Sequence, residues 1–155
     1  MTTPAPRPAP APPASATVVL GAMALDLTAV AVFVAVGRAS HDEGASIWGY
    51  LNALWPFLTG WVIGWSSCLL IDALLRMRAV SGGRPPGTGW QPQRLFPAGV
   101  TVWIGTVAIG MLLRWVSGQG TAAAFIVVAS IATAILLLGW RLVALLLGRR
   151  TARRG

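Results

Sequence analysis

The sequence predicts an all-α fold: a four-helix transmembrane bundle preceded by a disordered Pro/Ala-rich N-terminal tail. Of its 155 residues, 55% are hydrophobic and 10% are charged, which lies outside the usual range of soluble globular domains. Four apolar runs are each long enough to cross the hydrocarbon core, because about 20 residues at about 1.5 Å each are sufficient. We expect these spans at about residues 17–37, 47–75, 97–116 and 121–147.

The two ends of the chain differ from its apolar middle. Residues 1–15 alternate Pro with Ala and hold a single charge, so they cannot build a core and should form the disordered tail. The run at 17–37 is longer than the apolar part of a cleavable secretory signal, and we expect it to remain as the first span. Residues 16–148 then form one membrane domain, and residues 149–155 form a basic C-terminal tail.

All twelve basic residues are arginines, and their placement indicates membrane topology. A net charge of +8 would suit a nucleic acid, but the arginines lie mostly in tails and loops between apolar runs, so we exclude nucleic acid as a partner. Nine fall on one side of the membrane: Arg7, Arg76, Arg78, Arg84, Arg94, Arg149, Arg150, Arg153 and Arg154. Arg38 and Arg114 fall on the other side. By the positive-inside rule, we expect both termini to be cytoplasmic. We also expect the membrane to be the plasma membrane, with anionic lipid at the arginine-rich face.

The run at 47–75 carries the main helix-packing signal. Pro56 has no backbone N–H for the carbonyl one turn earlier, so we expect a kink there. Gly60 and Gly64 form a GxxxG pattern, which allows another helix to approach closely. In the third span, Gly110 shares a face with Thr106 and Arg114. We expect helix contacts at Pro56, Gly60, Gly64 and Gly110.

Three charged residues lie within the spans: Asp26, Asp72 and Arg141. Asp26 is near the bilayer midplane, where a charge costs roughly 2.5–3.5 kcal/mol, so it should face the protein interior and be protonated or partnered. Asp72 and Arg141 lie near the cytoplasmic ends of their spans, and a pair between them fits. The candidate partners for Asp26 are an arginine and the hydroxyl residues Thr59, Ser66, Ser130 and Thr133. We favour helix-to-helix contacts over a proton or ion pathway through Asp26.

A second polar group lies toward the outer ends of the first and third spans: Arg38, His41, Asp42, Glu43 and Arg114. If these spans are neighbours, the group could bind an anion or sense pH near the ordinary histidine pKa of about 6.5. A hydrated loop with snorkelling arginines is the simpler interpretation. Adjacent residues cannot converge as a catalytic triad, and most metal sites need three or four converging ligands. We therefore expect no catalytic residue, metal or cofactor.

Two features repeat along the chain. The first and third spans each end outside in an arginine, and the second and fourth each contain Gly-Trp, at 64–65 and 139–140. Two hairpins of like orientation would form a parallel repeat. The match is sparse, and we do not prefer a repeat over coincidence.

Several short motifs are spread in order over all four spans. They are Asp26 with Gly37-Arg38-Ala39-Ser40-His41, Trp55-Pro56-Phe57, Gly64-Trp65, Gly110-Met111-Leu112-Leu113-Arg114, Phe125 with Val128, and Gly139-Trp140-Arg141. In these motifs the chain resembles the bacterial membrane proteins of domain of unknown function 3054, found mostly in actinobacteria. The resemblance implies a four-span membrane protein and brings no characterised activity.

These observations favour a small, non-enzymatic integral membrane protein with a structural or interaction role. The alternative is a small transporter or channel with Asp26 as the proton- or ion-coupling residue. Such a protein would be a homo-oligomer, because four helices leave a narrow path. A third option is a membrane enzyme that uses the outer group around His41.

Overall fold

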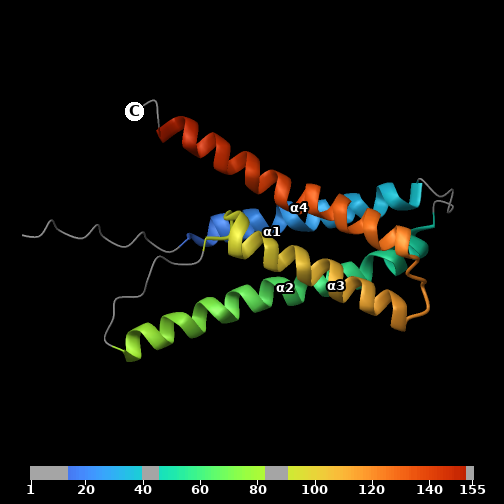
Figure 1. Cartoon of the computed structure of the whole chain (residues 1–155), viewed down its shortest axis with the longest axis horizontal. Coiled ribbons are helices and arrows are strands. Elements are labelled where there is room, and N and C mark those ends of the chain that lie inside the picture. Colours follow the sequence, from blue (N-terminus) through green and yellow to red (C-terminus); the bar gives the residue numbers. More distant parts are fainter. Residues whose placement is uncertain (1–13, 40–45, 83–90, 153–155) are drawn as a thin grey trace, which may run out of the picture.

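The computed structural model describes residues 14–39, 46–82 and 91–152, and within these ranges the chain is helical with no strand. The elements are α1 (Ala16–Ala39), α2 (Ile47–Ser81), the π-helical turn η1 (Leu95–Gly99), α3 (Val100–Val116) and α4 (Ala123–Ala152) (Figure 1). Four helical segments are long and apolar enough to cross a membrane. The predicted all-α bundle of four spans is therefore confirmed. The expected N-terminal tail lies almost entirely outside the described residues.

The helix α2 is longer than the sequence suggested, because it continues past residue 75 to Ser81. The added segment is rich in good helix formers, and Arg76 pairs with Asp72 one turn earlier. The helix ends where the backbone N–H of Gly82 donates to the carbonyl of Arg78. Pro56 lies within α2, and the helix continues through it.

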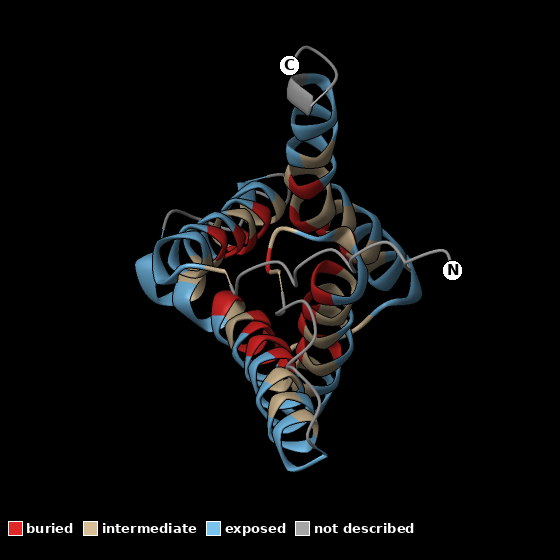
Figure 2. Ribbon diagram, turned by 90° about the vertical axis from the view of Figure 1, so that its left-hand side faces the viewer, coloured by how far each residue is buried: buried red, intermediate tan, exposed pale blue. Residues whose placement is uncertain are grey.

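The helices form a ring in which each one packs against the next, with α4 returning to α1. In Figure 2 the buried residues lie on the inward-facing sides of the four helices. Both described ends of the chain, the start of α1 and the end of α4, lie at the same end of the bundle, which we call the termini end (Figure 1). The turn between α3 and α4 lies at the opposite end.

The closest helix contact joins α2 to α3, and glycines make it possible. A Cβ atom added to Gly60 would lie 2.6 Å from the carbonyl oxygen of Gly105, and one added to Gly64 would lie 3.0 Å from the Cα of Val102. A Cβ added to Gly110 would lie 2.8 Å from the ring of Phe57. The small face of α2 thus packs against α3, where larger residues would not fit.

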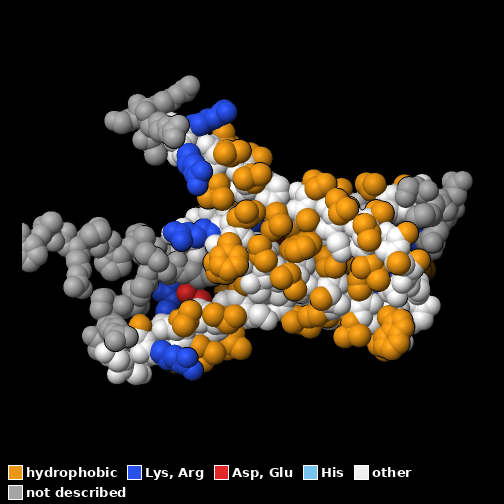
Figure 3. Space-filling view, viewed as in Figure 1, with side chains coloured by type: hydrophobic (Ala, Val, Ile, Leu, Met, Phe, Trp, Pro, Cys, Tyr) orange, Lys and Arg blue, Asp and Glu red, His pale blue; other side chains and the backbone are white. Residues whose placement is uncertain are grey.

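The outside of the bundle is apolar over most of its length. Figure 3 shows hydrophobic side chains over the middle of the molecule and arginines gathered mainly at the termini end. Many of these Leu, Ile and Val side chains are more than 40% exposed. Such a surface suits a hydrocarbon environment.

Candidate functional site

A buried ion pair between α1 and α4 lies at the centre of the bundle. The side chains of Asp26 and Arg141 are each 0% exposed. Arg141 Nη1 donates to Asp26 Oδ1 at 2.7 Å, and Nη2 donates to Oδ2, also at 2.7 Å. This two-pronged geometry is the strongest arrangement available to an arginine and a carboxylate.

Two tryptophans complete the hydrogen bonds to the carboxylate. Trp65 of α2 donates its indole N–H to Oδ2 of Asp26 at 3.0 Å, and Trp140 of α4 donates to Oδ1 at 2.8 Å. Each carboxylate oxygen therefore accepts one bond from arginine and one from an indole. A carboxylate offers about four lone-pair sites, so protein donors fill the acceptor capacity of Asp26.

The guanidinium group of Arg141 is held from other directions as well. Its Nε donates to the carbonyl of Pro92 at 3.1 Å, and Nη1 donates to the carbonyl of Leu137 at 2.6 Å. The guanidinium carbon lies 4.4 Å from the ring centroid of Trp140. The arginine stem passes close to Gly99, where an added Cβ would lie 2.7 Å from Cδ of Arg141. The site thus joins α1, α2, α4 and the segment before α3.

Of the two pairings that the sequence left open, an arginine with Asp26 is confirmed and Asp72 with Arg141 is wrong. Asp72 instead accepts a 2.7 Å bond from Arg76 of its own helix, and its side chain is 24% exposed. Arg141 reaches Asp26 because α4 continues to Ala152, which places Arg141 deeper than the predicted span end implied. At about 1.5 Å per residue, Asp26 lies about 15 Å from the start of α1 and Arg141 about 16 Å from the end of α4. In addition, α1 packs directly on α4, whereas α2 lies across the ring from it.

The hydroxyl residues proposed as partners of Asp26 make other bonds. Thr59, Ser130 and Thr133 each donate to a carbonyl one turn earlier in their own helices. Ser66 is exposed. Sequence analysis missed Trp65 and Trp140 as donors to Asp26, although the repeated Gly-Trp of the second and fourth spans contained both. Pro92 had no such signal, since it acts through its backbone carbonyl.

The outer polar group is described in part. His41, Asp42 and Glu43 lie outside the described residues, whereas Arg38 and Arg114 lie at the end of the bundle opposite the termini end. Arg114 Nη1 donates to the side chain of Gln119 at 3.0 Å, and Nη2 donates to its backbone carbonyl at 3.2 Å. Gln119 in turn donates to the carbonyl of Asn52 at 3.0 Å, which ties the α3–α4 turn to α2.

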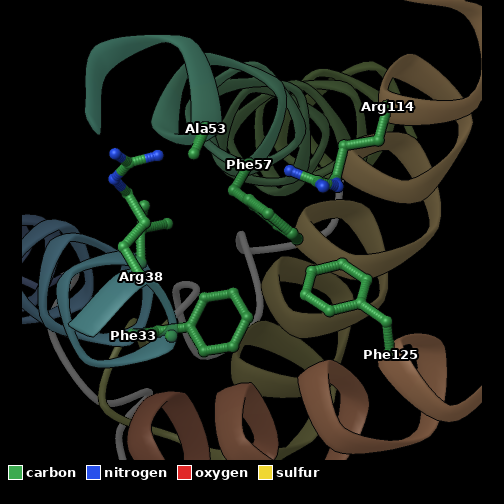
Figure 4. A pocket seen from close by; sticks show the side chains of 8 residues that line it. Phe33, Arg38, Ala53, Phe57, Arg114 and Phe125 are labelled. Carbon is green, nitrogen blue, oxygen red and sulfur yellow. The ribbon is translucent and has the colours of Figure 1, made fainter. Parts of the chain in front are cut away.

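A pocket of about 70 Å³ lies between these two arginines and receives residues from all four helices. We call it the arginine pocket. Its lining residues are Phe33, Val34, Gly37, Arg38, Ala53, Phe57, Arg114 and Phe125. Figure 4 shows Arg38 and Arg114 on opposite sides of the pocket, with the rings of Phe33, Phe57 and Phe125 between and below them. The pocket therefore combines positive charge with an aromatic wall.

The described residues contain no group of three or more His, Cys, Asp or Glu side chains placed to hold a metal. The two polar features are chemically distinct. The Asp26–Arg141 pair is closed and has its acceptors filled, whereas the arginine pocket has open volume and guanidinium groups.

A ring of four apolar helices around a buried ion pair defines a multi-pass helical membrane protein. The chain belongs to the family described as "Protein of unknown function (DUF3054)", whose model matches residues 23–144. This match extends from the middle of α1 into α4 and includes both members of the ion pair. No curated protein and no solved structure matches the chain.

Proposed function

We propose that this chain is a non-enzymatic structural or interaction protein of an actinobacterial plasma membrane. In this proposal the ion pair of Asp26 and Arg141 holds α1 and α4 together and stabilises the helix bundle. Both termini would lie in the cytoplasm, because most arginines of the described residues gather at the termini end (Figure 3). Those arginines would contact anionic lipid headgroups.

The observation that carries the structural role is the complete set of hydrogen bonds around Asp26. A coupling carboxylate in a transporter must accept a proton or ion from water at some stage. Here two arginine N–H groups and two indole N–H groups occupy its oxygens, and its exposure is 0%. Such a pair links helices that hydrophobic attraction alone does not hold together in lipid.

The arginine pocket favours a second candidate, an oligomeric transporter with Asp26 as its coupling residue. All four helices line the pocket, so it lies on the axis of the bundle. The rings of Phe33 and Phe57 pack edge to face at 5.2 Å and are part of its wall. Transport would require water to pass these rings and reach Asp26.

Thiol labelling of a single cysteine separates the two candidates. Val30 is 1% exposed and lies one helical turn from Asp26 toward the pocket. In a Cys68→Ser background, Val30→Cys should resist a small membrane-impermeant thiol reagent in sealed cells. Gly37→Cys, in the pocket wall, should react and serves as the control. Rapid labelling of Val30→Cys would favour the transporter instead.

A further inference from the structure

We infer that the outward-facing side of α2 binds a second copy of this chain, so that the protein forms a two-fold symmetric dimer in the membrane. The surface that carries this contact, which we call the α2 seam, consists of Trp48, Asn52, Trp55, Thr59, Val62, Ser66 and Leu69. The inference rests on the interaction role proposed above and names the partner for it.

The spacing of the seam is that of a helix–helix contact. Its residues follow one another at alternating intervals of four and three positions, which is the heptad pattern of two helices that cross at about 20°. All of them are exposed except Thr59, which is half-buried. At about 100° per residue, buried residues of α2 such as Phe57, Gly60 and Trp61 lie on the opposite side of the helix. The seam therefore faces away from the core of the bundle (Figure 2).

Polar side chains recur along the seam at every seventh position, at Asn52, Thr59 and Ser66. We place the exposed Trp48 and the arginine Arg76 at the two membrane surfaces. Thr59 and Ser66 then lie on either side of the midpoint of the span. Polar groups at this depth meet no water, and side chains of this kind commonly hydrogen-bond to a neighbouring helix.

Two of these polar side chains have hydrogen-bonding groups to spare. The hydroxyl of Thr59 donates at 2.9 Å to a carbonyl one turn earlier in α2. The backbone carbonyl of Asn52 has no donor within the helix, because Pro56 lacks an N–H, and it accepts from the side chain of Gln119 at 3.0 Å. Among the residues that the structure describes, the side-chain amide of Asn52 and the hydroxyl of Ser66 have no such partner. Lipid tails offer them neither a donor nor an acceptor, whereas another helix does.

Symmetry makes a second copy the best partner for these groups. Every copy of the chain crosses the membrane in the same direction. A two-fold axis along the membrane normal therefore brings the two α2 helices together in parallel, with each residue at the depth of its counterpart. Amides and hydroxyls both donate and accept, so Asn52 can bond to the partner's Asn52 and Ser66 to the partner's Ser66. A single asparagine at a heptad position also fixes the register and the number of helices in coiled coils.

Disulfide crosslinking of the full-length protein in native membranes is the first test. In a Cys68→Ser background, Val62→Cys places one thiol on the α2 seam. Ile131→Cys is the matched control, because Ile131 is 57% exposed, against 50% for Val62, but belongs to α4. We expect oxidation to give mainly covalent dimer with Val62→Cys and mainly monomer with Ile131→Cys. Equal crosslinking of the two, or monomer from both, would overturn the inference.

Energy transfer between labelled copies in liposomes then measures the strength of association. Asn52→Leu should weaken association about tenfold and Ser66→Ala about threefold, because each removes hydrogen bonds between helices. Thr28→Ala is the control: it removes a hydroxyl of α1 that bonds within its own helix, and it should leave association unchanged. Association that is as strong in Asn52→Leu as in the unaltered protein would contradict the seam. A monomer at every protein-to-lipid ratio would contradict it as well.

Unfolding of the same variants separates this inference from the role of the ion pair. Since Asn52 and Ser66 face away from the core, their variants should keep the helix content of the unaltered chain and unfold as its monomer does. A stable monomer would thus reject the second copy as the partner and leave the ion pair of Asp26 and Arg141 in place. Conversely, an Asp26→Asn protein that dimerises and is no less stable would reject the ion pair's role and retain the seam.

Discussion

Arg141 and Asp26 are separated by 115 positions in the chain, yet their side chains meet in two parallel 2.7 Å hydrogen bonds at the centre of the bundle. The bond joins the first helix to the last and closes the ring of four. Since no water contacts a group with 0% exposure, each charge depends on the other for its stability. This dependence leads to quantitative predictions.

Removing the carboxylate charge should destabilise the protein strongly. Asp26→Asn leaves the buried guanidinium without a counter-charge, and we expect a loss of about 3–5 kcal/mol in the free energy of unfolding. The matched control is Asp72→Asn, because the pair of Asp72 with Arg76 is partly exposed to solvent and should contribute about 0.5 kcal/mol or less. Reversible unfolding in mixed detergent micelles measures both, and equal losses would contradict a special role for Asp26.

Trp65 and Trp140 should each stabilise the folded protein through the hydrogen bond that its indole N–H donates to Asp26. Trp65→Phe and Trp140→Phe remove a hydrogen bond to a charged acceptor, and we expect each to cost about 1.5–3 kcal/mol. Trp61→Phe is the control, because its buried indole N–H has no hydrogen-bond partner in the described part of the chain. It should cost less than either of the other two in the same unfolding assay. A larger loss at Trp61 would show that ring packing, and not the bond to Asp26, explains the effect.

The contact between α2 and α3 should tolerate no side chain at its closest point. Gly60→Ala would place Cβ 2.6 Å from a backbone carbonyl oxygen, and the overpacking should cost about 1–3 kcal/mol. Gly139→Ala meets no atom within 4 Å, so its higher helix propensity should leave stability unchanged or raised by up to about 1 kcal/mol. Melting temperatures of the two variants compare them directly. A stable Gly60→Ala protein would show that the helices are further apart than described.

The orientation can be tested without purification. A reporter fused after Gly155 should be active in its cytoplasmic form, because the arginines at the termini end favour the inner leaflet. Fusions after residue 45, in the connection between α1 and α2, should report the periplasm. The reverse pattern would contradict the proposed orientation, because the termini would then lie in the periplasm.

The four spans could be predicted from the sequence because apolar runs of this length can adopt few stable structures other than a membrane-spanning helix. Helix ends were predicted less well, since α2 continues through two arginines that resembled the start of a loop. Arginines remain compatible with a helix when their side chains can extend to the membrane surface. The length of α2 thus depends on local helix propensity as well as on hydrophobicity.

The components of the site were predicted from the sequence, and an arginine was among the candidate partners of Asp26. Asp26 and Arg141 stood out as charges within spans, but their estimated depths also allowed a pair of Arg141 with Asp72. The correct partner depends on which helices are neighbours, and nothing in one sequence states that α4 packs on α1. The repeated Gly-Trp was visible in the sequence. That both indole N–H groups donate to the same carboxylate, Asp26, could be recognised only from the structure.

A double-mutant cycle on Asp26→Asn and Arg141→Gln tests the central claim most directly. If the pair fastens the bundle, each single variant should be strongly destabilised, and the double variant should be more stable than the sum of the losses predicts. We expect a coupling of at least about 2 kcal/mol. Losses that add to within about 0.5 kcal/mol would show that the two charges act independently, which would contradict the account.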